Sequence, residues 1–167
     1  LGYADTPTIL TAAEIPIAVV VLLALAAIMA ISDNRRALRV LHGLMFAGAL
    51  TITGSTALWQ LGWLDPAVWM ILVGLGLYIG YVPYGCVLFD RLIATLGVVG
   101  TAGFMIYVTD AFGYAGSVTI LLIRDFGSPE LSWLEFFMGL SHATGLIAAL
   151  GIALSWAYFS RRTRGSS

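Results

Sequence analysis

Residues Val98–Leu122 read VVGTAGFMIYVTDAFGYAGSVTILL, and this stretch decides the fold class. It is long enough to cross a bilayer, because roughly 20 predominantly apolar residues span the hydrocarbon core. Asp110 lies near its middle, and a carboxylate at that depth costs about 3 kcal/mol on insertion scales. Such groups face protein or water rather than lipid. The stretch therefore predicts a helix bundle within a membrane, with a polar pathway or a buried polar contact at Asp110.

The composition of the whole chain agrees with a membrane protein. Its 167 residues are 60% hydrophobic and 10% charged, with a mean hydropathy of +0.96, whereas soluble domains carry roughly 25% charged residues. No basic patch with interleaved aromatic residues occurs, so nucleic-acid binding is not expected. The single cysteine, Cys86, excludes an internal disulfide and a multi-cysteine metal site. The chain starts at Leu1 without a basic leader, which suggests a processed chain or a fragment.

Hydropathy and helix-start signals predict one transmembrane domain over residues 1–160 and a polar cytoplasmic tail over residues 161–167. Asp65 followed by Pro66, and Ser128 followed by Pro129, are typical of a helix N-cap and first helical position. The five expected spans cover about residues 12–31, 37–61, 66–93, 98–123 and 129–159.

Three local patterns refine these spans. Thr11 and Glu14 have the spacing of a capping box at the start of the first span. Pro83 interrupts the third span and predicts a kink, because proline removes a backbone donor. Gly76 and Gly80 form a small-xxx-small pair that predicts a close helix approach. Plain helix packing accounts for the last two patterns without a functional role.

The arginines predict the orientation. The chain has eight basic residues, all of them arginine. Seven of them fall on one side of the membrane and only Arg124 falls on the other. The positive-inside rule therefore places the C-terminus in the cytoplasm and the N-terminus outside. An aromatic belt is expected on the outer side, formed by Trp59, Trp63, Trp69 and Trp133. The residues on the cytoplasmic side are Arg35, Arg36, Arg39, Arg91, Arg161, Arg162 and Arg164.

Six stretches carry a family resemblance, namely residues 33–38 (DNRRAL), 69–78 (WMILVGLGLY), 81–84 (YVPY), 88–94 (LFDRLIA), 111–118 (AFGYAGSV) and 128–133 (SPELSW). They resemble an uncharacterised bacterial family of major-facilitator-like membrane proteins (domain of unknown function 5690). In the major facilitator fold, two six-helix halves rock around a central cavity. The resemblance implies that the five spans are most of the C-terminal half of such a fold.

The resemblance also implies a charged latch at the cytoplasmic face. The run from Asp33 to Arg36 resembles a degraded form of the superfamily's charged loop motif, and the pair at 90 and 91 lies on the same face. Five spans do not form two rocking halves. The remainder is therefore absent from this chain, or is supplied by partner chains, or transport has been lost. The implied latch residues are Asp33, Arg35, Arg36, Asp90 and Arg91.

A polar stripe follows one face of the fourth span. Gly103, Tyr107, Asp110, Tyr114 and Ser117 recur at helical spacing, which places them on the same face. One interpretation is that they line a substrate or proton path. The other is a polar seam that holds neighbouring helices together.

Two further groups are candidates for such a path. His142, on the fifth span, can lie within about two turns of Asp110 in depth, and a pair between them would lower the cost of the carboxylate. The alternative is that His142 bonds to a carbonyl or hydroxyl. Tyr78, Tyr81 and Tyr84 surround the expected kink, where their hydroxyls can recognise a polar substrate or bond to neighbouring helices.

No cofactor and no enzyme activity are expected. A transmembrane histidine can ligate haem or chlorophyll magnesium, but His42 and His142 lie at different depths, which disfavours a bis-histidine site. No HExxH, CxxC or paired-carboxylate motif occurs. No nucleophile–base set can be assembled from the sequence.

The sequence leaves two alternative functions open. The first is a major-facilitator-like secondary transporter of the bacterial inner membrane, or its C-terminal part, which the mid-membrane Asp110 favours. The second is a non-transporting structural or accessory subunit of a larger respiratory or photosynthetic complex, which the short chain favours. The expected partners are the lipid bilayer and either other membrane protein chains or a missing N-terminal portion.

Overall fold

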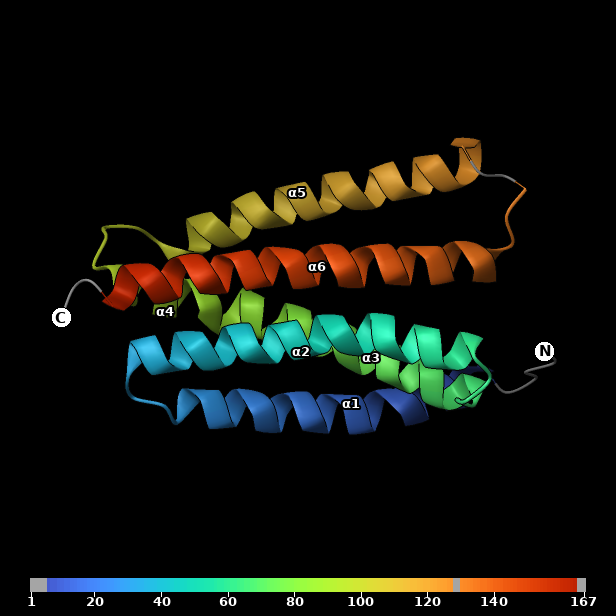
Figure 1. Ribbon diagram of the computed structural model, residues 1–167, viewed down its shortest axis with the longest axis horizontal. Coiled ribbons are helices and arrows are strands. Elements are labelled where there is room, and N and C mark those ends of the chain that lie inside the picture. The colour runs from blue at the N-terminus through green and yellow to red at the C-terminus, as the bar shows by residue number, and fades with distance from the viewer. Residues whose placement is uncertain (1–5, 128–129, 165–167) are drawn as a thin grey trace.

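The computed structural model describes residues 6–127 and 130–164, which form a bundle of antiparallel helices (Figure 1). The described residues contain no strand, so the predicted all-helical fold is confirmed. In chain order, the elements are α1 (Thr6–Met29), α2 (Asn34–Gln60), α3 (Pro66–Pro83), the π-helix η1 (Tyr84–Leu88), α4 (Phe89–Leu96), α5 (Ala102–Leu122), the π-helix η2 (Ile123–Gly127) and α6 (Trp133–Arg164).

Four segments in the described residues are long and apolar enough to cross a membrane. They confirm four of the five expected spans and a multi-pass membrane protein. The described apolar part of α1, Glu14–Met29, is shorter than that length, so the first span stays a prediction. The four segments are Asn34–Gln60, Pro66–Leu96, Ala102–Gly127 and Trp133–Arg161.

Aspartate caps determine where α2 and α3 begin. Asp65 Oδ1 accepts a hydrogen bond from the Ala67 N–H at 2.8 Å, and Pro66 occupies the first position of α3, as predicted. Asp33 Oδ1 accepts from the Arg36 N–H at 2.7 Å. Because this cap lies at residue 33, α2 begins earlier than the predicted residue 37.

The capping box predicted at Thr11 and Glu14 is wrong. Helix α1 begins at Thr6, so Thr11 and Glu14 lie inside the helix rather than at its start. The spacing of a capping box is also the spacing of two residues one turn apart within a helix, and the sequence pattern does not separate these cases.

The start of α6 also differs from the prediction. The predicted cap, Ser128 with Pro129, lies outside the described residues. Helix α6 begins at Trp133, and Ser132 with Glu135 forms its reciprocal cap. Glu135 Oε2 accepts from the Ser132 N–H at 2.9 Å, and Ser132 Oγ accepts from the Glu135 N–H at 3.2 Å.

Pro83 interrupts the third span, as predicted. Helix α3 ends at this residue, and η1 carries the chain into α4 as a wide turn. Proline removes an α-helical hydrogen bond, and π turns are a common way to accommodate such a break. Pro83 is fully buried, and Tyr84 packs edge-on against Phe89 with 5.1 Å between the ring centroids.

Helix α2 is the centre of the bundle. It packs against α3 and α6, while α1 packs mainly against α3 (Figure 1). A smaller cluster near the α2–α3 turn contains Ile52, Trp69 and Val73. The main core cluster, near the start of α2, contains Ile28, Leu38, Leu41, Met45 and Leu88.

Glycines bring the backbones of α2 and α3 into contact. A methyl group on Gly76 would lie 2.7 Å from the carbonyl oxygen of Gly48. One on Gly48 would lie 2.8 Å from the Gly76 oxygen and 3.1 Å from the Gly80 nitrogen. The predicted close approach is therefore confirmed at Gly76, whereas a Cβ on Gly80 would meet nothing within 4 Å.

Arg124 lies at the opposite end of the bundle from other arginines, as their positions in the sequence predicted. The α1–α2 turn, the α4–α5 connection and the end of α6 lie at one end of the bundle, with Arg35, Arg91 and Arg161 (Figure 1). The α2–α3 turn and η2, with Arg124, lie at the other end.

One residue of the predicted aromatic belt is buried instead. Trp69 is only 4% exposed, and it stacks on Trp59 with 4.2 Å between the ring centroids. Its Nε1–H donates to Thr56 Oγ1 at 3.1 Å. The belt prediction is wrong for Trp69 because its indole N–H has a partner inside the bundle. Trp63 and Trp133 are exposed.

Candidate functional site

Helix α5 carries the polar stripe and has little packing within this chain. Its main contacts are with α4 and η2, the segments next to it in sequence. In the most apolar stretch of the segment Ala102–Gly127, no residue is buried. In the corresponding stretch of α2, 44% of the residues are buried. Figure 1 shows α5 at the edge of the bundle, tilted away from α6. The stripe therefore lies on the least covered helix of the protein.

Asp110 is partly exposed in the middle of α5. In the described part of the chain, its carboxylate has no hydrogen-bond or ion-pair partner. Tyr107 and Tyr114, one turn away on either side, are 78% and 75% exposed. Ser117 Oγ donates to the Gly113 carbonyl at 3.0 Å, so this hydroxyl is satisfied by its own helix. The stripe presents an unpaired acid flanked by two outward-facing aromatic rings.

The structure does not pair His142 with Asp110. The Nε2 atom of His142 lies 3.0 Å from Gln60 Oε1, and Gln60 Nε2 donates to Met138 Sδ at 3.6 Å. An amide oxygen only accepts, so the proton of His142 lies on Nε2. The pair with Asp110 is not formed because α5 leans away from α6, although the two helices are neighbours in sequence.

Both ring nitrogens of His42 are occupied inside the bundle. Nδ1 lies 2.7 Å from the Leu38 carbonyl oxygen, and Nε2 lies 3.0 Å from Ser155 Oγ. Because a carbonyl only accepts, Nδ1 carries the proton and Nε2 accepts from the serine. The rings of Trp156 and Phe159 lie 6.5 Å and 6.3 Å from the imidazole. A metal at Nε2 would have to displace Ser155.

The described residues hold no group of three His, Cys, Asp or Glu side chains that could bind a metal ion. The tyrosines at the break in the third span differ in burial. Tyr78 is 48% exposed and Tyr81 is 64% exposed, whereas Tyr84 packs against the main core cluster.

A side-chain hydrogen bond joins the two charged runs of the predicted latch region. Arg91 Nη1 donates to Asn34 Oδ1 at 2.7 Å, which joins α4 to the first turn of α2. Asn34 was not among the predicted latch residues. The other predicted latch residues at this end are Asp33, Arg35, Arg36 and Asp90.

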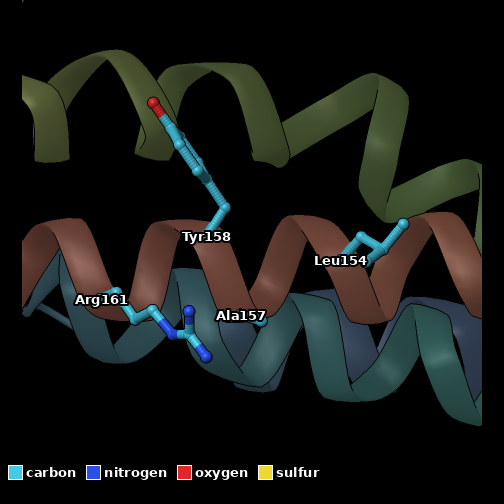
Figure 2. A pocket seen from close by; sticks show the side chains of 4 residues that line it. All are labelled: Leu154, Ala157, Tyr158 and Arg161. Carbon is cyan, nitrogen blue, oxygen red and sulfur yellow. The ribbon is translucent and has the colours of Figure 1, made fainter.

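Among the hollows along α6 are a larger and a smaller one with different linings. One, of about 730 Å³, is lined by Leu154, Ala157, Tyr158 and Arg161. Figure 2 shows Leu154 and Tyr158 pointing toward the neighbouring ribbon of the α4–α5 segment, while Arg161 points away from it. The other hollow, of about 320 Å³, lies between the end of α5 and the start of α6. The described side chains do not fill these spaces.

Two contacts were not expected from the sequence. The guanidinium carbon of Arg124 lies 4.3 Å from the ring centroid of Trp133 and 5.9 Å from that of Phe136, a cation–π contact that joins η2 to α6. A methyl group on Gly145 of α6 would overlap Thr53 Oγ1 of α2. Neither contact has a local signal, because each joins residues from different helices.

No curated protein and no solved structure matches this chain. A family described as "Family of unknown function (DUF5690)" matches residues 1–162, which is nearly the whole chain. The chain therefore belongs to the DUF5690 family.

Proposed function

We propose that this chain is part of a major-facilitator-like secondary transporter, in which α5 lines a path between this bundle and a second one. The observation that carries the proposal is the exposure of α5 together with the unpaired carboxylate of Asp110. A charge at mid-membrane depth costs about 3 kcal/mol against lipid, so it needs water or protein beside it. A cavity between two rocking bundles supplies both.

The second bundle comes from residues outside this chain or from a partner chain. The protein lies in the bacterial inner membrane, with its N-terminus outside and its C-terminus in the cytoplasm. This orientation puts Arg35, Arg91 and Arg161 on the cytoplasmic side, which is the bias expected for short loops. In this position, the link between Arg91 and Asn34 would contribute to a cytoplasmic latch. The protein carries out no chemistry of its own and needs no cofactor.

A second candidate is a structural subunit of a larger membrane complex. Tyr107 and Tyr114 present large rings outward from α5, and Ser117 is already bonded to its own helix. Such a surface also suits permanent burial against the helices of another subunit. The two candidates differ in whether water reaches the Asp110 face of α5.

Cysteine accessibility separates the candidates without knowledge of the substrate. Cys86→Ala removes the one cysteine of this sequence, and any cysteine elsewhere in the natural polypeptide is replaced in the same way. Single cysteines are then placed at Tyr107, Asp110 and Ser117 in the natural polypeptide, in native membranes. The transporter proposal expects rapid reaction with a charged, membrane-impermeant thiol reagent at these positions.

Cysteines on the opposite face of α5 are the matched controls. Val108 and Phe112 are about 160° from Asp110 at 100° per residue, and they should stay unreactive. Equal protection on both faces would contradict the transport path and favour the structural subunit. Equal reactivity on both faces would contradict both candidates, because it would mean that α5 does not cross the membrane.

A further inference from the structure

The smaller hollow is an apolar groove at the end of the bundle that holds η2. It is lined by Ile120 from α5, by Ile123 from η2, and by Phe136, Gly139 and Leu140 from α6. Glu135 is the charged member among the described lining residues. Arg124 lies next to the groove, because its guanidinium packs over the ring of Phe136.

The lining of the groove favours a hydrocarbon chain. The α6 side, from Glu135 to Ala143, extends over roughly 12 Å at 1.5 Å per residue. Apart from Glu135, the described residues that line it are apolar. A groove of this length and lining suits part of one acyl chain.

Arg124 supplies unused hydrogen-bond donors beside this groove. The cation–π contacts fix its position over Trp133 and Phe136. Its Nε atom is buried without an acceptor, and its guanidinium has no hydrogen bond within the described part of the chain. A guanidinium with free donors matches the oxygens of a phosphate group.

Glu135 supplies the opposite charge. Its Oε2 atom accepts hydrogen bonds from the Ser132 N–H at 2.9 Å and from Ser132 Oγ at 2.7 Å. These bonds hold the carboxylate in place, and Oε1 has no bond within the described residues. The groove is thus bordered by a fixed cation and a fixed anion, which is the charge pattern complementary to a zwitterionic headgroup.

We infer that the α5–α6 groove binds a zwitterionic phospholipid of the phosphatidylethanolamine type. One acyl chain lies in the groove, the phosphate bonds to Arg124, and the ammonium group lies beside Glu135. This lipid site goes beyond the proposed function, since it is independent of whether the protein transports a solute.

Native mass spectrometry of the natural polypeptide in detergent tests the inference. Phosphatidylethanolamine, phosphatidylglycerol and diacylglycerol with the same acyl chains are added at equal concentration. Phosphatidylethanolamine should be retained at least about fivefold more than diacylglycerol, since charge-assisted hydrogen bonds exceed 1 kcal/mol. Arg124→Gln should remove this difference, and Glu135→Gln should remove the preference over phosphatidylglycerol.

Gly139→Leu is the second variant, because Arg124→Gln also removes the contact with Trp133. A Cβ on Gly139 meets nothing within 4 Å, so the leucine fills the groove without a clash. Gly151→Leu is its matched control on the same helix, with equally open space. Loss of retained lipid in the Gly139 variant alone supports the inference. Equal retention of phosphatidylethanolamine and diacylglycerol by the wild type, or unchanged retention in the Gly139 variant, would overturn it.

Discussion

Gly76→Ala tests whether α2 and α3 are held at backbone contact. The added methyl group would lie 2.7 Å from the Gly48 carbonyl oxygen, 2.7 Å from Ile52 Cγ1 and 3.2 Å from the Ile52 nitrogen. Ordinary contacts start at 3.4 Å, so α3 would have to move by about 0.7 Å. Two of the three obstacles are backbone atoms of α2, which cannot rotate away. Overpacking of this kind costs about 1–3 kcal/mol.

Gly80→Ala is the matched control. Both substitutions replace glycine with alanine inside α3, and each gains about 1 kcal/mol of helix propensity. A Cβ on Gly80 meets nothing within 4 Å, so this variant carries no steric cost. The difference between the two variants therefore isolates the contact with α2. We expect Gly76→Ala to be less stable than Gly80→Ala by about 1–3 kcal/mol.

Reversible unfolding in mixed micelles of a mild detergent and sodium dodecyl sulfate measures this difference. Near-ultraviolet circular dichroism is a suitable signal, because the stacked rings of Trp59 and Trp69 lie on the two helices concerned. The double variant, with alanine at both Gly48 and Gly76, should lose less unfolding free energy than the two single variants lose together. A single displacement of α3 relieves both contacts. Unfolding of Gly76→Ala and Gly80→Ala at the same denaturant fraction would refute the close contact.

Four other substitutions have defined outcomes. Asp110→Asn should lower proton-coupled flux in vesicles by roughly a hundredfold and leave the yield of folded protein unchanged, and a lost yield would mark Asp110 as structural. Gly145→Ala should have a free energy of unfolding about 1–3 kcal/mol lower than that of its control Gly151→Ala. Equal unfolding midpoints for the two variants would exclude the tight α2–α6 contact. His42→Ala should destabilise by about 3 kcal/mol, and Ser155→Ala by about 1 kcal/mol in the same assay, because the serine variant removes one hydrogen bond and keeps the ring.

The features that sequence predicted correctly depend on neighbouring residues or on composition. Asp65 and Pro66 begin α3 because an aspartate cap and a proline first position are both local signals. Pro83 breaks the third span for an equally local reason, which is its missing N–H. The helical class and the membrane environment follow from composition, because charged residues are scarce over the whole length of the chain.

The features that sequence did not predict depend on distant parts of the chain. From its residue type and its place near a helix end, Trp69 was predicted to lie in the interfacial aromatic belt. Its burial is explained only by Thr56, which lies on another helix. Asp110 and His142 match in depth, but depth does not fix whether α5 packs against α6. Thr53 with Gly145, and Arg124 with Trp133, meet across helices without any periodic signal.

The central position of α2 has a consequence for biogenesis. By mean hydropathy, α2 is the least apolar of the four membrane-length segments, and it is also the most buried. Its polar groups at His42 and Thr53 are covered by α6, which is synthesised about a hundred residues later. A nascent chain that has not yet produced α6 exposes these groups to lipid. Correct insertion of α2 therefore depends on a helix that leaves the ribosome much later, so termination before α6 should send the product to proteolysis.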